Sequence, residues 1–187
     1  IYRIRDDNNK EMWIYKDGVY VEHAQTYLRT YIEKRIQKAY KERFANRVIN
    51  RIAAKEEVVI DKEDFFEPKK DRICLENGIY DLSTGELTPH TPDEIHFQKI
   101  PVEYKEDAEC PKINEFFHNV VETEKDVESL KEMFAFCLRK EYFLEKAFML
   151  LGEGRNGKSK TLEILRRFLG QDNCTNVELQ DLDDDNK

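Results

Sequence analysis

The residues best suited to chemistry form a glycine-rich loop near the end of the sequence. The stretch from Gly152 to Ser159 reads GEGRNGKS and matches the pattern of a phosphate-binding loop. Its three glycines allow backbone turns that are closed to residues with side chains, so that successive N–H groups and the positive end of a following helix converge on phosphates. The loop therefore predicts a site for ATP and Mg²⁺.

Nine consecutive residues are assigned to this site as cofactor-binding: Gly152, Glu153, Gly154, Arg155, Asn156, Gly157, Lys158, Ser159 and Lys160. Lys158 is also the candidate catalytic residue, because its cation is expected to reach the β- and γ-phosphates. Ser159 is the candidate Mg²⁺ ligand. The alternative is a glycine-rich turn that caps an ordinary helix.

The elements that must position this loop are a strand before it and a helix after it. Ala147 to Leu151 is an apolar run of strand length, and Thr161 to Leu169 has helical character with Gly170 as its stop. The helix after such a loop normally feeds a parallel sheet, yet only Gln171 to Lys187 follow. We therefore expect an incomplete ATPase domain.

Composition narrows the class of protein. The chain has 187 residues and a net charge of −8, which argues against a wholly basic nucleic-acid binder but leaves local patches open. Its four cysteines are widely spaced without a CxxC pair, which favours reduced thiols over a metal or disulfide framework. No run is long and apolar enough to span a membrane and no signal-peptide core is visible, so we expect a cytoplasmic protein without a membrane partner.

The N-terminal region predicts a hairpin followed by basic helices. Met12 to Val21 flanks an Asp-Gly turn signal, and His23 to about Lys55 reads as helix, broken near Tyr40. Apolar residues recur in this helical stretch every four residues: Leu28, Ile32, Ile36, Tyr40, Phe44, Val48 and Ile52. Tyr27, Tyr31 and Tyr40 are expected in the core or at its boundary rather than stacked on bases.

The same helices carry a local excess of positive charge. Four of the cations are our candidate nucleic-acid contacts: Arg35, Lys38, Arg43 and Arg47. Such a face is able to follow a DNA backbone by neutralising phosphates. The alternative is a solvated helix surface.

The middle of the chain predicts a linker and a small β unit. Glu56 to Lys70 reads as a linker pinned by Phe65 and Phe66. Arg72 to His90 predicts short strands, and Phe97 to Tyr104 predicts a further strand at an edge or bulge because of Pro101.

Two helices are expected before the glycine-rich loop. The first spans about Lys112 to Val121, and the second runs from Glu124 to about Lys140 with Thr123 as its cap. After the loop and its helix, Cys174 to Leu179 predicts a short strand or loop, and Asp181 to Lys187 a solvated tail.

The predicted fold class is α+β: a helical N-terminal module with small antiparallel hairpins, leading into an incomplete P-loop α/β ATPase of AAA+-like type. Three domains are expected, namely residues 1–62 with the hairpin and basic helices, 63–143 with the β unit and its helices, and 144–187 with the start of the ATPase.

The order of these pieces resembles the primase–helicases of phages, plasmids and large viruses, whose ATPase belongs to the superfamily-three helicases. The matching segments are Asn77 to Leu82, Thr84 to Leu87, Pro89-His90, Pro101 to Tyr104, Ala108, Cys110-Pro111, Gly152 to Ser159 and Leu179 to Leu182. The resemblance covers about Ile73 to Leu182, and more weakly the first seventy residues.

This resemblance implies a replication helicase that binds ATP and Mg²⁺, forms hexamers on single-stranded or forked DNA, and works with a primase domain or partner. By position it assigns the phosphates and Mg²⁺ to Gly152, Gly157, Lys158 and Ser159. Lys160 departs from many relatives, which have a small or apolar residue there. The Walker B carboxylates, the sensor and the arginine finger are expected beyond Lys187.

Two other functions compete with this one. A non-enzymatic DNA-binding or oligomerisation module would carry an unused loop, whereas a small P-loop kinase would place its loop near the N-terminus with most of its sheet afterwards. The kinase hypothesis is the weaker of the two.

Overall fold

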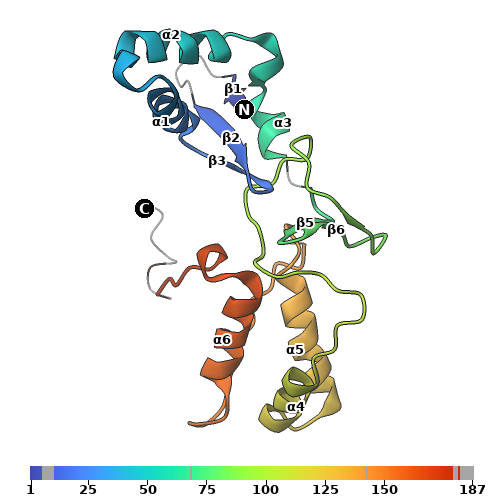
Figure 1. Ribbon diagram of the computed structural model, residues 1–187. Coiled ribbons are helices and arrows are strands. Elements are labelled where there is room, and N and C mark those ends of the chain that lie inside the picture. Colours follow the sequence, from blue (N-terminus) through green and yellow to red (C-terminus); the bar gives the residue numbers. More distant parts are fainter. Residues whose placement is uncertain (6–10, 68, 142, 179–180, 182–187) are drawn as a thin grey trace. The chain divides into compact units, whose positions relative to one another are not determined.

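The computed structural model describes residues 1–5, 11–67, 69–141, 143–178 and 181 (Figure 1). The chain forms two compact units, of which the first comprises Ile1–Lys69 with His90–Phe97 and the second Lys70–Pro89 with Gln98–Lys187. Both mix helices with small sheets, so the fold is α+β as predicted. The three predicted domains stay a prediction, because packing units need not coincide with functional domains.

The first unit is built on a small four-stranded sheet. Its strands are β1 (Tyr2–Ile4), β2 (Met12–Lys16), β3 (Val19–Val21) and β4 (Val59–Ile60), in the order β3-β2-β1-β4. The predicted hairpin is confirmed, with Asp17 and Gly18 at φ of 50° and 92° in its turn. The β1 to β4 pairing is parallel and joins residues more than fifty positions apart. No feature of the neighbouring sequence predicts it.

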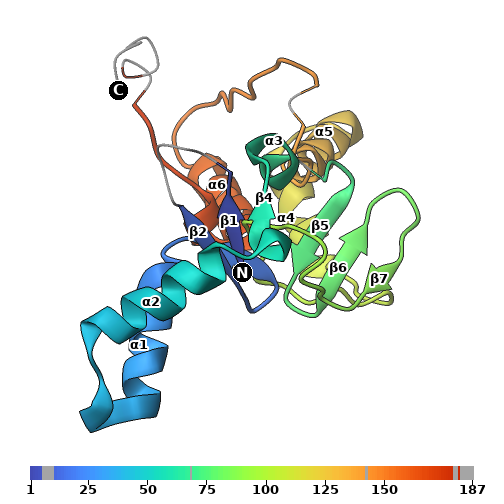
Figure 2. The same cartoon turned by 90° about the horizontal axis from the view of Figure 1, so that it is seen from above.

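Two helices follow the hairpin, and the predicted break near Tyr40 is confirmed. They are α1 (Ala24–Ile36) and α2 (Glu42–Ala53), joined by the short 3₁₀ helix η1 (Gln37–Ala39). Figure 2 shows them as a helical hairpin with this connection at its tip.

The predicted apolar face of these helices is only partly confirmed. Leu28 and Ile49 are buried, but the side chain of Phe44 is 48% exposed. A four-residue spacing drifts from the 3.6-residue period, and the break at η1 resets the helical phase. Tyr27 and Tyr31 are also about half exposed, which excludes the core position among the two that were predicted, whereas Tyr40 is partly buried and fits the boundary position.

The predicted linker between residues 56 and 70 is largely structured. It contains η2 (Glu56–Val58), β4 and α3 (Lys62–Phe66). Phe65 is fully buried and has ring contacts with Trp13, Tyr20 and Phe97 at centroid distances of 5.1–5.7 Å. This aromatic cluster is one of two core clusters in the first unit, which explains why a polar stretch with two phenylalanines does not behave as a linker.

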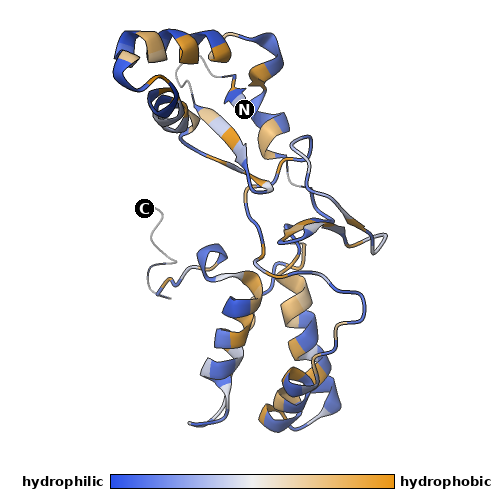
Figure 3. Ribbon diagram, in the orientation of Figure 1, coloured by the Kyte–Doolittle hydropathy of each residue, from blue (hydrophilic) through white to orange (hydrophobic). Residues whose placement is uncertain are grey.

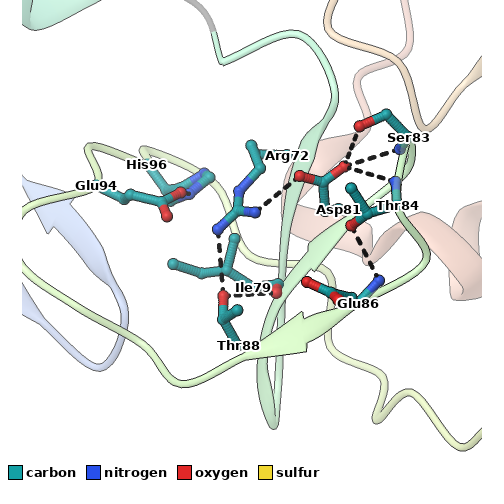
Figure 4. Close-up of polar contacts among 9 residues, drawn as sticks. All are labelled: Arg72, Ile79, Asp81, Ser83, Thr84, Glu86, Thr88, Glu94 and His96. Atoms are coloured by element: carbon teal, nitrogen blue, oxygen red, sulfur yellow. Dashed lines mark hydrogen bonds and ion pairs between the residues drawn. The ribbon is translucent and has the colours of Figure 1, made fainter.

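The second unit opens with a three-stranded antiparallel sheet. The strands β5 (Arg72–Leu75), β6 (Gly78–Asp81) and β7 (Leu87–Thr88) confirm the predicted short strands and turns. In Figure 4 the guanidinium of Arg72 lies between Asp81 and Thr88, with Nη1 2.9 Å from Asp81 Oδ2 and Nη2 3.2 Å from Thr88 Oγ1.

The strand predicted from Phe97 to Tyr104 does not form. The segment forms only an isolated parallel bridge to β5, in which Ile100 N donates to Cys74 O at 2.9 Å. Val102 N then donates to Ile100 O, which turns the backbone at Pro101 and ends regular pairing.

Three helices complete the second unit: α4 (Pro111–Val120), α5 (Glu124–Phe136) and α6 (Lys158–Leu169), with η3 (Gln171–Asn173) after the last. Thr123 caps α5 as predicted, accepting from Asp126 N at 3.2 Å. The helix ends earlier than expected, and beyond its end Arg139 pairs with Asp71 at 2.9 Å. A core of Phe117, Val127, Leu130 and Met133 joins α4 to α5.

The strand predicted from Ala147 to Leu151 is absent, and this corrects the expected P-loop sheet. The segment is irregular, and Phe148, Met149 and Leu151 are 50%, 78% and 79% exposed. A strand forms only through backbone hydrogen bonds to a neighbour, and no strand of the described residues pairs with this segment. Figure 3 shows apolar residues along α5, the helix that precedes this segment.

Two further expectations concern the end of the chain and the membrane. Cys174 to Glu178 is irregular rather than strand, while residues 179–180 and 182–187 lie outside the described residues. The predicted solvated tail falls almost entirely on these residues. No helix in the described ranges combines the length and apolar character needed to cross a bilayer.

Candidate functional site

The glycine-rich loop contains three residues with positive φ and leads directly into α6. Gly152, Arg155 and Gly157 have φ values of 149°, 63° and 85°. Gly157 is the N-cap of α6, which begins at Lys158, three residues before the predicted start and at the loop's own lysine. The helix axis therefore starts where the phosphates are expected.

Two glycines of the loop are required by close neighbours and one is not. A Cβ on Gly157 would collide with Val120 of α4, and one on Gly152 would collide with the side chain of Asn156. A Cβ on Gly154 meets nothing within 4 Å. The backbone shape thus depends on Gly152 and Gly157.

Lys158 points back into the loop. Its Nζ donates to Gly152 O at 2.8 Å, to Glu153 O at 3.0 Å and to Asn156 Oδ1 at 2.7 Å. These are three neutral acceptors, and an ammonium group binds the anionic oxygens of a phosphate more strongly than neutral oxygens because opposite charges attract. Ser159 beside it is exposed, as a hydroxyl meant for an Mg²⁺ ion would need to be.

The N-terminal end of α6 is not capped by its own residues. Gly157 offers no side-chain cap and the first turn contains no acidic residue. Lys160 instead pairs with Glu163 at 2.9 Å, and Glu163 in turn accepts from Arg167 at 2.7 Å. These two cations, above all Lys160, hold the pKa of Glu163 below its ordinary value. Lys160 is therefore engaged along the helix rather than with the loop.

A cavity of about 320 Å³ lies against the loop in the second unit. Leu130, Met133 and Leu150 contribute apolar wall, while Asn156 and Lys158 contribute polar groups. Its size is at the low end for small-molecule sites.

The described ranges hold no group of three or more His, Cys, Asp or Glu side chains placed to bind an ion, and the four cysteines are free thiols.

The four predicted nucleic-acid residues lie together on the helical hairpin of the first unit. Arg35 is in the last turn of α1, Lys38 in η1, and Arg43 and Arg47 are one turn apart on α2. All four side chains are exposed. Arg29 ties the two helices by donating to Asn46 Oδ1.

Sequence reasoning missed the role of one acidic residue in the second unit. Asp81 Oδ1 accepts from the N–H groups of Ser83 and Thr84 at 2.8 and 3.1 Å (Figure 4). Hydrogen bonds from Ser83 and Arg72 hold the pKa of this carboxyl far below its ordinary value. Its position before a Ser-Thr-Gly turn was the available signal, since Asp commonly closes such turns.

Comparison with known proteins places the chain in a family. A family described as "D5 N terminal like" matches residues 2–122, a range that includes both helices of the hairpin and ends before the glycine-rich loop. The chain is also similar to "Putative helicase L207/L206" of Acanthamoeba polyphaga mimivirus, at 29% identity over 103 residues. That alignment covers 52% of this chain and 11% of the viral protein, so the chain spans a small part of that relative. The chain belongs to the D5 N terminal like family, and the resemblance to viral and phage primase–helicases is confirmed.

Proposed function

We propose that this chain is part of a replicative DNA helicase driven by ATP, with the nucleotide bound by residues 152–160. One observation carries the proposal. The N-terminal end of α6 has no acidic residue and no side-chain cap, and the ammonium group of Lys158 lies inside the loop that precedes it. A helix end and a cation with no carboxylate between them favour a polyanion such as a triphosphate.

Different residues of the chain would bind the phosphates and the Mg²⁺ ion. Lys158 would exchange its contacts with Gly152, Glu153 and Asn156 for the β- and γ-phosphates, and Ser159 would hold the ion. Mg²⁺ supplies charge neutralisation during phosphoryl transfer. Gly157 keeps the backbone open for close approach of the phosphates.

The proposal also covers the substrate, self-association, partner and location of the helicase. The viral relative is named a helicase. The family match supports a role for this chain, too, in genome replication. We propose single-stranded or forked DNA as the substrate, hexameric self-association, and a primase domain or partner, all within the cytoplasm or wherever the genome is copied.

A fluorescent ATP analogue with Mg²⁺ tests the nucleotide site. We expect weak but saturable binding by the chain, reduced roughly tenfold or more in Lys158→Ala because a charge-assisted contact is lost. Arg166→Ala is the matched control, since it removes one exposed cation from the far end of the same helix. Equal binding by the wild type and Lys158→Ala would exclude the loop as the phosphate site.

A second function is favoured by a different observation. The family match stops at residue 122 but includes the basic helices, as expected of a DNA-binding or assembly module without enzymatic activity. This alternative predicts salt-sensitive DNA binding that ignores ATP. Neutralising Arg35, Lys38, Arg43 and Arg47 would lower the slope of log affinity against log salt.

A further inference from the structure

The outer face of α1 presents two tyrosines to solvent. Tyr27 and Tyr31 are 49% and 47% exposed, while Ala24 and Leu28 on the inner face are buried. The helix therefore packs without these rings. Neighbouring exposed aromatic side chains form a contiguous surface of the kind that contacts a ligand or partner.

The two rings are nearly parallel. Their planes differ by 15° and their centroids lie 6.5 Å apart, at the wide end of the range for aromatic pairs. A pair at that distance leaves ring surface available to a further planar group.

Arg35 extends this surface by one more turn. Its guanidinium carbon lies 5.3 Å from the centroid of the Tyr31 ring. Three flat groups thus follow one another along α1 at residues 27, 31 and 35, spaced by about 6 Å of helix rise. A guanidinium plane, like an aromatic ring, stacks on nucleobases.

The charge around this surface is strongly positive. Between Ala24 and Ala53 the sequence has eight Lys or Arg residues and two acidic ones, on a chain whose net charge is −8. A second copy of this hairpin would be repelled, and an apolar protein partner would have to desolvate these cations. A polyanion that also carries planar groups satisfies both features.

We propose that Tyr27, Tyr31 and Arg35 form a stacking surface for the unpaired bases of single-stranded nucleic acid, with the surrounding cations on its phosphates. This assignment rests on the proposed replication function and adds the residues that would contact the unpaired bases. Duplex DNA keeps its base faces stacked inside the helix, so it would use only the cations. The surface therefore selects unpaired strands.

Fluorescence anisotropy with a labelled oligothymidylate, without nucleotide, tests this proposal on the full chain. The double variant Tyr27→Leu with Tyr31→Leu keeps apolar bulk but loses the rings, and we expect its affinity to fall at least tenfold at every salt concentration. The salt slope should not change, because no charge is removed. Tyr27→Phe with Tyr31→Phe should bind within about twofold of the wild type, since stacking is retained.

Matched controls separate stacking from general damage. Phe143→Leu removes a ring that is 53% exposed and also lies under an arginine, Arg139 at 5.2 Å, but in the second unit. It should leave oligothymidylate binding unchanged. Binding of the matching duplex should fall less than twofold in the tyrosine-to-leucine variant.

The outcomes that would overturn the proposal are distinct. Wild-type affinity in the leucine double variant would exclude stacking, and an equal loss on duplex would indicate damage to the cations' arrangement. A change in sedimentation without a change in DNA affinity would identify the tyrosines as a protein interface. Because no ATP is present, failure here leaves the nucleotide site untouched, and failure of ATP binding leaves this result untouched.

Discussion

Two glycine-containing turns of the second unit solve the same backbone problem in opposite ways. In the turn from Asp81 to Glu86, the N–H groups of Ser83 and Thr84 point at a carboxylate that the chain itself supplies. In the loop from Gly152 to Gly157, the following helix starts without any side-chain acceptor or acidic first turn. The first turn binds its own anion, whereas at the start of α6 the ammonium group of Lys158 is bound to neutral oxygens.

The difference explains why only one of these turns is a candidate site. Asp81 is engaged by Arg72 as well as by the turn, so the first turn has no remaining capacity for an external anion. The loop at residues 152–157 presents a helix end and an ammonium group that a phosphate would satisfy. Substitutions in either turn, or in the helices beside the loop, test this comparison.

The largest effect is expected from the glycine that starts α6. Gly157→Ala places a Cβ at a φ of 85° and against Val120, so it should destabilise the second unit by about 1–2 kcal/mol from the backbone alone. The collision adds to this cost. Thermal unfolding and ATP-analogue binding should both show the loss.

Gly154→Ala is the internal control for that change. A Cβ there meets nothing within 4 Å, and we expect a shift in the unfolding midpoint of no more than about a degree. If both alanines behaved alike, the loop would not be held in the conformation described.

The second prediction gives the loop an anion of its own. Asn156→Asp would place a carboxylate beside Lys158 Nζ, now 2.7 Å from the amide oxygen, and would repel the phosphates. We expect ATP-analogue affinity to fall roughly tenfold or more, with thermal stability unchanged or slightly higher. Undiminished binding would break the comparison, because a carboxylate at this position would then be compatible with the ligand.

Local signals were enough to predict much of this framework. The Asp17-Gly18 turn, the Thr123 cap, the helix from about Lys112 to Val121 and its counterpart ending at Gly170 are all confirmed to within a few residues. Each depends on a residue and its near neighbours in the chain, which are visible in a single sequence.

Features that depend on packing between distant segments could not be predicted from the sequence. The parallel pairing of β1 with β4, the central position of Phe65, and the exposure of Tyr31 depend on which distant segments pack together. The strand expected at Ala147 to Leu151 was wrong for the same reason, since pairing needs a partner strand. The residues of the phosphate site stay a prediction, although the backbone that would present them is now described.

The third prediction removes the anion from the other turn. Asp81→Asn should lower the thermal midpoint at neutral pH, because the carboxylate that closes the turn and pairs with Arg72 loses its charge. Since folding lowers the pKa of Asp81, its contribution is present above the ordinary value of 3.8 and is lost as the pH falls toward the folded value. The unfolding midpoints of the wild type and Asp81→Asn should therefore differ most near neutral pH and become equal in acid. A difference that stays constant with pH would assign the effect to packing alone.

The smallest effect concerns the helix pair that supports the loop. His118 on α4 contacts Asn114 O at 2.7 Å and Glu124 Oε2 at 3.0 Å, close in sequence to Val120 beneath Gly157. These contacts raise the pKa of His118 above 6.5, so its contribution is complete below that pH and is lost as the pH rises through the folded value. His118→Gln should therefore lower the unfolding midpoint slightly in mild acid and not in mild alkali. The same variant should leave the acid-side behaviour of Asp81 unchanged, so that the helix pair beside the loop and the turn at Asp81 can be distinguished by pH within one molecule.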